Sequence, residues 1–291
     1  MRLKQEYPHL AVGQLCGLFG KTRHAYYDHQ WRRDDQVLMD EIILQLVIEI
    51  RLALPGIGTR KIQYLLKPKL QEHCILVGRD HLFDLLGRHH LLIRNRRRKA
   101  ITTDSRHWMR KYSNLVKEIE ILWPEQLWVS DITYIRLTNE FAYLSLITDA
   151  YSRKIVGFSL RKDLSREGCM DALKMALASR KYDHQSLIHH SDRGSQYCCK
   201  EYVALLTSNK IAISMTENGD PYENALAERV NGIIKTEFKL YSSTLGIEQT
   251  KQQVATSIHN YNTIRPHASC DYLTPEQAHL KSGKLKKRWK N

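Results

Sequence analysis

The sequence predicts an α/β core that follows an all-α region, with the core built from three antiparallel strands and then alternating helices and strands. Three apolar segments of strand composition follow one another through connections short enough for antiparallel hairpins. After them, segments with helical spacing of apolar residues alternate with short apolar runs. Before residue 100, helical spacing predominates. The predicted strands cover residues 127–137, 141–149, 153–161, 186–190 and 211–215, and the helices between them cover 165–180 and 199–208.

Residues 1–33 have the pattern of a helix-turn-helix. Apolar residues recur on one face of the first segment, a glycine permits a turn, and Thr22 can cap the second helix. The second helix would present Lys21, Arg23 and Tyr26, which suit DNA phosphates and base edges in the major groove. An ordinary helical hairpin would give the same pattern.

Residues 34–100 are also predicted to be helical. A helix is expected from Asp34 to Ala53, where a Pro-Gly pair stops it. The region 55–95 then fits either a second helix-turn-helix or a helical spacer. A basic run ends this region. It could lie along a phosphate backbone, or it could be a solvated linker. The arginines at the centre of the run are Arg96, Arg97 and Arg98.

The expected domain boundaries follow from these shifts in composition. We expect a helix-turn-helix at 1–33, a helical region at 34–100, a linker at 101–120, a catalytic core at 121–283 and a basic tail at 284–291.

Length and charge predict a globular protein whose basic flanks suit binding to nucleic acid. The chain has 291 residues, 42% hydrophobic content and a net charge of +14, which allows a normal core and two or three domains. The positive excess lies before residue 120 and after residue 280, so these flanks should supply most of the salt-dependent attraction to phosphates. The alternative is that the charge only keeps the protein soluble.

Cysteine spacing and hydropathy exclude several other classes. The six cysteines show no CxxC pairing, so we expect no zinc finger and a reduced, cytoplasmic protein. The apolar run Ile42–Ile48 is interrupted by Gln45 and is too short to span a bilayer. The amino terminus has no apolar signal-peptide segment, and no membrane partner is expected.

Three acidic residues stand in positions that suit a catalytic site. Asp131 lies in an apolar strand, where a buried carboxylate is costly unless a cation neutralises it. Asp192 ends a short apolar run and opens a turn, which places it at the carboxyl end of a strand. Glu228 lies in a segment with helical spacing of apolar residues, on the face towards the sheet.

The spacing of these acids indicates phosphoryl transfer. Glu228 follows Asp192 after 35 intervening residues, and Lys235 comes two helical turns after Glu228. Three oxygen ligands without thiolates suit Mg²⁺ or Mn²⁺. Two such ions, about 3.5–4 Å apart, clamp the attacking and leaving oxygens of a phosphodiester. Lys235 and Arg229 would position phosphates.

The three acids could also be ordinary residues without a catalytic role. The chain holds 31 Asp and Glu residues, and any three could be selected afterwards. Asp149 is the main competing acid. Its position before a Tyr-Ser-Arg sequence is typical of a hairpin turn rather than a metal ligand.

Five ordered motifs resemble the catalytic proteins of bacterial insertion-sequence transposases with an integrase-type core. They are WVSDITYI, LITDAYSRKIVGFSL, HHSDRGSQY, the loop from Gly219 to Ala225, and YNTIRPH with LTP after it. The three acids then correspond to the DDE signature of transposases and retroviral integrases. The loop departs from the family pattern at Asp220 and Glu223. Its Tyr222 and Asn224 are candidates for contact with terminal nucleotides.

The resemblance implies a ribonuclease H-like core and a DNA transposase that cleaves strands and transfers them. Catalysis would need Mg²⁺ or Mn²⁺, with two ions held by Asp131, Asp192 and Glu228. Expected partners are the element ends, target DNA, further copies of the chain and an upstream-encoded small DNA-binding protein. The expected location is the bacterial cytoplasm, associated with the nucleoid. A nuclease of the same fold without joining activity and a DNA-binding regulator with a relic core remain the alternatives.

Overall fold

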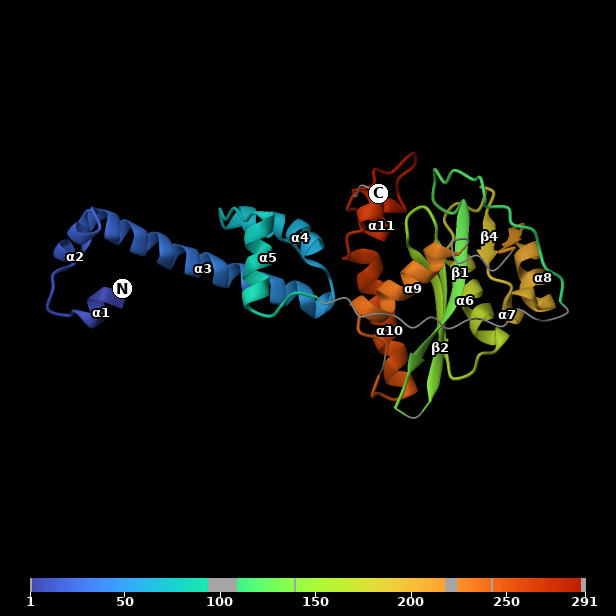
Figure 1. Ribbon diagram of the computed structural model, residues 1–291. Helices are drawn as coiled ribbons and strands as arrows, with labels where there is room; N and C mark the ends of the chain where they lie inside the picture. Colours follow the sequence, from blue (N-terminus) through green and yellow to red (C-terminus); the bar gives the residue numbers. More distant parts are fainter. Residues whose placement is uncertain (1, 94–108, 139, 218–223, 242, 289–291) are drawn as a thin grey trace. The chain divides into compact units, whose positions relative to one another are not determined.

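The computed structural model describes all residues except 1, 94–108, 139, 218–223, 242 and 289–291 (Figure 1). The chain forms two compact units. The first comprises Met1–Glu49 with Leu66–Leu92, and the second comprises Ile50–Leu65 with Ile93–Asn291. The run that contains Arg96, Arg97 and Arg98 lies outside the described residues, as does Tyr222.

Helices build the amino-terminal part of the chain. The side-chain oxygen of Thr22 accepts a hydrogen bond from the Ala25 N–H at 3.1 Å, which confirms that Thr22 caps a helix. That helix, α3, is longer than expected, and its predicted start at Asp34 is wrong. Residues 23–53 contain neither Gly nor Pro, so nothing in this segment interrupts helical hydrogen bonding. The helices are α1 (Arg2–Glu6), α2 (Val12–Leu18), α3 (Arg23–Ala53), α4 (Thr59–Glu72) and α5 (Arg79–Arg88).

Within the first unit, α3 is tied to α5 by a polar contact beside apolar packing. Asp40 on α3 accepts hydrogen bonds from His81 at 2.7 Å and from Arg88 at 3.2 Å. Leu82 and Leu85 of α5 are fully buried. The helical spacing of the apolar residues therefore does produce a packed helical unit in this region.

A five-stranded mixed sheet forms the centre of the second unit. Its strand order is β3-β2-β1-β4-β5. The first three strands pair antiparallel, whereas β4 pairs parallel with β1 and β5 pairs parallel with β4. This is the ribonuclease H-like arrangement, and the predicted fold class is confirmed. The strands are β1 (Leu127–Arg136), β2 (Phe141–Asp149), β3 (Ile155–Arg161), β4 (Ile188–Ser191) and β5 (Ala212–Met215).

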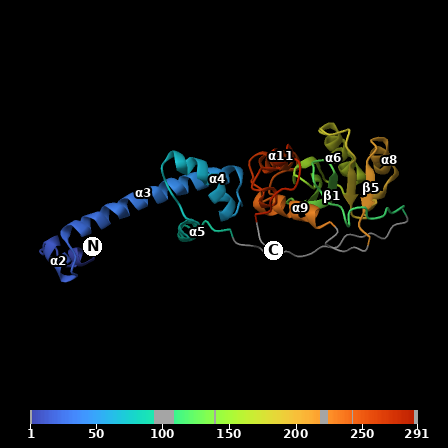
Figure 2. The ribbon, with the colours of Figure 1, turned by 90° about the horizontal axis from the view of Figure 1, so that it is seen from above.

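Helices cover both faces of this sheet (Figure 2). The helices α6 and α8 lie on one face, and α9 lies on the other, against β1 and β2. The helix α10 contacts α9 and β3. The helices are α6 (Arg166–Ala178), α7 (Ser195–Cys198), α8 (Lys200–Ser208), α9 (Ala225–Glu237), α10 (Ile247–Thr263) and α11 (Pro275–Ala278), with a 3₁₀ turn at Ala268–Cys270.

Alternation along β1 decides which side chains face which helices. Trp128 belongs to the apolar cluster under α6, α7 and α8. Leu127 and Val129 belong to a separate cluster with Ala227 of α9. Because side chains alternate across a sheet, the odd-numbered positions of β1, Asp131 among them, face α9.

The expected linker region is partly attached to the sheet edge. The Met215 N–H of edge strand β5 donates to the Ser113 carbonyl at 3.4 Å, and the Leu115 N–H donates to the Ser214 hydroxyl oxygen at 2.9 Å. The segment around residues 113–115 therefore covers the open side of β5, as edge strands require.

The loop between α3 and α4 is part of the second unit. The Gly56 N–H donates to the Glu237 carbonyl at 2.6 Å, and the Asn260 amide donates to the Ala53 carbonyl at 3.0 Å. Gly56 has no room for a side chain, since a Cβ there would lie 2.7 Å from the Glu237 backbone. This loop therefore packs directly on the end of α9.

Asp149 proves to be a structural residue of the β2–β3 turn. Its carboxylate is fully buried and accepts hydrogen bonds from the Ser152 N–H at 2.7 Å and the Ser152 hydroxyl at 2.6 Å. The Glu125 N–H donates to its other oxygen at 2.7 Å, and His279 lies 3.6 Å away. The prediction of a turn residue is confirmed.

Within the part of the chain that the structure describes, no helix is long and apolar enough to cross a membrane.

We expect Gly157→Ala to destabilise the core strongly. A Cβ at Gly157 on β3 would lie 2.1 Å from the Ala172 carbonyl oxygen of α6, so the strand and helix would have to separate. Overpacking of this kind costs roughly 1–3 kcal/mol. Urea unfolding of both proteins measures the difference.

A matched control lies on the same pair of elements. Gly168 of α6 would place its Cβ 3.3 Å from the flexible Ser145 hydroxyl, and a helical glycine gains stability on substitution by alanine, up to about 1 kcal/mol. Gly168→Ala should therefore be nearly neutral. Equal losses in the two variants would contradict the close packing at Gly157.

Candidate active site

The parallel pairing of β1 with β4 brings two of the predicted acids together. Leu127 pairs with Ile188, and Val129 pairs with His190. Continued two residues further, this register would set Asp131 opposite Asp192, which directly follows the last residue of β4. Neighbouring strands lie about 4.8 Å apart, so the two carboxylates leave adjacent strands at the same level.

Asp131 is half-buried, and its carboxylate is held from two sides. The Asn231 side-chain amide of α9 donates to Asp131 Oδ2 at 2.8 Å. The Ile132 N–H donates to Oδ1 at 2.9 Å. These two donors fix the direction in which the carboxylate points, while the charge itself has no cation bonded to it among the described residues.

Asp192 is also half-buried and begins a tight turn. The Gly194 N–H donates to Asp192 Oδ1 at 3.0 Å. Gly194 is buried and its position leaves little room, because an added Cβ would lie 3.0 Å from Asp192 Oδ1. The short helix α7 starts at the next residue, so strand, turn and helix together orient this carboxylate.

The third acid, Glu228, is exposed in the first turn of α9. Asn231 lies three residues later on the same helix, close to one turn further on, and it bonds Asp131 directly. The helix that carries Glu228 is therefore attached to β1 at the position of the first acid.

The three acids influence one another electrostatically. Burial raises the pKa of Asp131, and the charges of Asp192 and Glu228 raise it further, to about 7. The hydrogen bonds from Asn231 and Ile132 act in the opposite direction but do not cancel the rise. The charges of Asp192 and Glu228 thus act on Asp131, where a negative charge is unfavourable without a cation.

Asn231 is a functional candidate that the sequence reasoning missed. Its side chain is almost completely buried and bonds Asp131, and its Oδ1 has no hydrogen-bond partner among the described residues. The signal in the sequence was its place three residues after Glu228, one helical turn along the same face. Asparagine alone gives no reason to look there.

Lys235 lies further along the same interface. Its ammonium group donates to the Thr133 hydroxyl oxygen at 3.2 Å and lies 4.1 Å from the centre of the Tyr134 ring. Thr133 is the next residue after Asp131 on the same face of β1. Lys235 therefore contacts the β1 residue that follows Asp131 on the same face of the sheet, and its side chain is partly accessible to solvent.

Arg229 is oriented differently from Lys235. It is exposed next to Glu228, and among the described residues it makes no hydrogen bond or ion pair. Its charge lowers the pKa of Lys61, after the larger effects of burial and Arg265.

Asn224 has an internal role in this structure. The side chain is buried, and its amide donates to the Ser130 carbonyl at 3.0 Å. It precedes α9 and ties the start of that helix to β1. Its Oδ1 has no hydrogen-bond partner among the described residues, and the expected contact with terminal nucleotides stays a prediction.

A buried polar network supports the two strands from the opposite face. His189 Nε2 on β4 is hydrogen-bonded to the Ser130 hydroxyl at 2.7 Å and to the Tyr202 hydroxyl at 2.9 Å. Burial and the nearby His190 lower the pKa of His189 to about 3, so the imidazole is neutral. Ser130 and His189 thus link β1 to β4 just before the two acids.

The predicted DNA-binding residues at the amino terminus belong to the first unit. Lys21 is exposed between α2 and α3, and Arg23 is exposed at the start of α3, 5.7 Å from the Tyr27 ring centre. Tyr26 is half-buried and meets Tyr27 edge-on at 5.4 Å. The residues are accessible, but they are not part of the acidic site.

The acids fit a divalent metal by their chemistry. Carboxylate oxygens without thiolates are the ligands of Mg²⁺ and Mn²⁺, and the raised pKa of Asp131 shows the local need for positive charge. Among the described residues, no group of three or more His, Cys, Asp or Glu side chains is already arranged to hold an ion. Metal binding would therefore involve local movement of these side chains.

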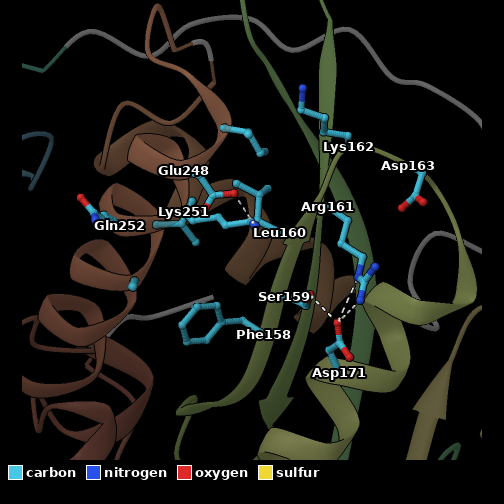
Figure 3. A pocket seen from close by; sticks show the side chains of 13 residues that line it. Phe158, Ser159, Leu160, Arg161, Lys162, Asp163, Asp171, Glu248, Lys251 and Gln252 are labelled. Atoms are coloured by element: carbon cyan, nitrogen blue, oxygen red, sulfur yellow. Dashed lines mark hydrogen bonds and ion pairs between the residues drawn. The ribbon is translucent and has the colours of Figure 1, made fainter.

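A sizeable groove lies elsewhere on the second unit. It has a volume of about 730 Å³ and runs between edge strand β3 and α10 (Figure 3). The ion pair between Arg161 and Asp171 and the one between Lys251 and Glu248 neutralise its charges. The acids of the candidate site do not line it.

Comparison with known proteins identifies the family. An integrase core domain family matches residues 123–221, and a second integrase core domain family matches residues 209–275. The chain is 34% identical to the 31 kDa protein of insertion element IS600 from Shigella sonnei over 271 residues, which covers 90% of this chain and 96% of that protein.

Two transposases also match, over a shorter region. The putative transposase for insertion sequence IS986/IS6110 of Mycobacterium tuberculosis is 34% identical across 52% of this chain and 56% of its own length. The transposase InsF for insertion sequence IS3A of Escherichia coli is 36% identical across 53% and 54%. The matched region thus spans about half of each transposase.

Among solved structures, the catalytic core domain of HTLV-2 integrase in complex with magnesium aligns with a TM-score of 0.44 and 20% identity, over 54% of this chain and 98% of that one. The sequence matches carry the assignment. The alignment with the IS600 protein covers nine-tenths of the chain at 34% identity, and both integrase core matches fall on the second unit. The chain therefore belongs to the bacterial insertion-sequence transposases with an integrase-type core.

Proposed function

We propose that this chain is a DNA transposase of the DDE type, which cleaves DNA strands at the ends of its element and joins them to target DNA. Asp131, Asp192 and Glu228 would be its catalytic residues. The observation that carries the proposal is the shared register of β1 and β4, which aligns Asp131 with Asp192 on the face covered by the Glu228 helix.

The three carboxylates would hold Mg²⁺ or Mn²⁺, and two ions fit a reaction at a phosphodiester. When bound, the metal supplies positive charge that stabilises the attacking and leaving oxygens. Asp131 and Asp192 already lie at one level of the sheet, and their mutual repulsion favours a cation between them. Glu228 is exposed, so its carboxylate is free to turn towards the two aspartates.

Neighbouring side chains would orient the reactants. Asn231 holds Asp131 in one direction, which fixes an oxygen towards the substrate. Lys235 offers a cation beside Thr133, within the reach of a phosphate on the same face. Both residues project from α9, so one helix sets the distance between the metal ligands and the phosphate contact.

Recognition of the element ends would come from outside the catalytic core. Lys21, Arg23 and Tyr26 are accessible near the start of α3 and suit contacts with DNA. The arginine run at positions 96–98 adds sequence-independent attraction to phosphates. Two ends must be held together for transposition, so we infer a multimer of this chain, with an upstream-encoded small DNA-binding protein as a further partner.

Asp192→Asn should abolish strand cleavage and joining. The change removes a metal ligand while it preserves side-chain size, and loss of one member of a catalytic group lowers the rate about 10³-fold or more. Labelled DNA with the element's ends, incubated with Mg²⁺ or Mn²⁺, separates cleaved from joined products.

The control for that assay is Asp183→Asn, which changes an exposed aspartate before β4. Joined products that persist in Asp192→Asn would exclude the assigned triad. Metal-dependent cuts without any joined product in the wild type would favour a nuclease, and intact DNA with retained binding would favour a regulator.

Asn231→Ala should lower activity by about 10–100-fold without a loss of fold. The variant removes the amide that holds Asp131 Oδ2, and supporting contacts of metal ligands typically have effects of this size. Initial rates as a function of Mg²⁺ concentration should show a weaker affinity for the metal, so that a higher Mg²⁺ concentration gives the half-maximal rate. Asn209→Ala, at the exposed end of α8, is the matched control; an equal rate loss there would point to a general effect.

Asp131 should make the stability of the metal-free protein pH-dependent. Its pKa is about 7 in the folded chain and near 3.8 when unfolded. The folded state therefore binds the proton more tightly, and this contribution is present below pH 4 and lost as the pH rises through 7. The free energies of unfolding of the wild type and of Asp131→Asn, measured in the presence of EDTA, should differ by an amount that changes between pH 4 and pH 7.

Metal should reverse this trend. Because bound Mg²⁺ or Mn²⁺ favours the ionised carboxylate, its stabilising effect should be larger at pH 8 than at pH 6. A wild-type minus Asp131→Asn difference that stays constant from pH 4 to 8 would contradict the assigned pKa.

A further inference from the structure

A strongly basic segment, residues 281–288, follows α11 in the second unit. We call it the basic strip. It contains five cations and no acid, and the cations are Lys281, Lys284, Lys286, Lys287 and Arg288. Such a composition fits a loose arm as well as an attached segment, so the hydrogen bonds of the strip decide between the two forms.

The start of the strip is attached next to a buried histidine. His279 precedes the strip, is only 2% exposed and is hydrogen-bonded through Nδ1 to the Ser152 hydroxyl at 3.0 Å. The Gly283 N–H then donates to the Leu122 carbonyl at 2.7 Å, and the Gly283 carbonyl accepts from the Tyr151 hydroxyl at 2.8 Å. Gly283 has a φ of +83°, a left-handed conformation that suits glycine, and the chain bends there. Both polar groups of its backbone are therefore bonded to segments that lie just before β1 and just after β2.

The end of the strip pairs with the turn at residues 268–271. The Lys286 carbonyl accepts from the Asp271 N–H at 3.0 Å, and the Arg288 N–H donates to the Ala268 carbonyl at 2.9 Å. The Arg288 guanidinium also bonds the Asp271 carboxylate. Backbone hydrogen bonds therefore hold the strip at both ends, in addition to charge.

The five cations of the strip differ in their partners. Lys284 lies 3.2 Å from the Glu120 carboxylate, and Arg288 is bonded to Asp271. The other three are exposed, and within the described chain their side chains make no hydrogen bond or ion pair. These three are Lys281, Lys286 and Lys287.

Backbone attachment thus presents three cations without a counter-charge on a fixed segment. Like charges that are held close together repel one another, and an anionic ligand would relieve that repulsion. Cations on a fixed backbone also lose less conformational entropy on binding than cations on a free arm. A ligand with many anionic groups in a row gains most from such an arrangement, and the DNA backbone is a ligand of this kind.

We propose that the basic strip is a fixed contact for the phosphate backbone of double-stranded DNA, made by Lys281, Lys286 and Lys287. Lys284 and Arg288 help to hold the strip in place instead. This deepens the proposed function, on which it rests, because it assigns part of the attraction to DNA to named cations of the catalytic unit.

The first test is the salt dependence of binding to a fluorescent DNA duplex of arbitrary sequence, measured by anisotropy in the presence of EDTA. Each lost phosphate contact lowers the magnitude of the slope of log K against log salt by about 0.9. Lys281→Gln, Lys286→Gln and Lys287→Gln should each lower it by about that amount. Lys174→Gln, which changes an exposed lysine of α6, should leave the slope unchanged.

Arg288 distinguishes a fixed strip from a free arm. Because Arg288 is bonded to Asp271, Arg288→Gln should leave the slope nearly unchanged. Asp271→Asn should raise the slope by up to about 0.9, since it releases the Arg288 cation for a phosphate. Asparagine tolerates the left-handed conformation of Asp271, whose φ is +56°, so the turn should persist. If Arg288→Gln lowers the slope as much as Lys287→Gln does, the segment acts as a free arm and the fixed contact is overturned.

Thermal unfolding separates lost phosphate contacts from lost stability. The three unpaired lysines have no side-chain partner to lose within the described chain, so their glutamine variants should keep the melting temperature of the wild type. Wild-type slopes in all three variants would overturn the proposal.

The binding assay requires no cleavage, so the strip and the proposed function can fail separately. Lower slopes in the lysine variants, with no metal-dependent cleavage by the wild type, would support the strip and refute the proposed function. Unchanged slopes with metal-dependent joining by the wild type would do the reverse.

Discussion

The repulsion between two carboxylates on adjacent strands is the constraint that the catalytic unit has to accommodate. Asp131 and Asp192 follow the same parallel register, and burial together with the neighbouring charge raises the pKa of Asp131 to about 7. Left alone, such a pair would favour separation of the strands. The hydrogen bonds of His189 to Ser130 and Tyr202, on the opposite face, hold β1 to β4 just before both acids. The strands therefore stay paired where their charges oppose pairing.

The helix α9 attaches the third acid to the strand that carries the first acid. Its first half carries Glu228 and the Asn231 that bonds Asp131. Its last residue, Glu237, is fixed by Arg265 and Lys61, and the Gly56 N–H bonds the Glu237 carbonyl. A buried ion pair of this kind is strongly destabilising when one partner is removed, because it leaves a buried charge. The position of Glu228, the proposed third catalytic acid, thus depends on contacts at the far end of its helix.

Pattern and composition predicted the layout of the core because each strand and helix has a local signature. Alternation and turn residues place β1, β2 and β3, and helical spacing places α9. The same reasoning failed where structure depends on distant contacts. Nothing local indicates that Asn231 bonds Asp131, and the start of α3 was misplaced because polar residues at its beginning obscured a helix that no Gly or Pro interrupts. Register and side-chain partners are properties of the assembled sheet.

The distribution of cations explains how a core with little net charge can act on a polyanion. In the second unit, Arg161 is bonded to Asp171, and Arg265 is bonded to Glu237, so these charges contribute little attraction at long range. Lys235 projects from α9 towards β1, and Arg229 is exposed on the same helix. In the proposed function, attraction at a distance would come from the basic flanks, and alignment would come from a few cations close to the acids. A DNA strand held beside Glu228 would have its phosphodiester positioned by such cations, which is the positioning that in-line attack requires.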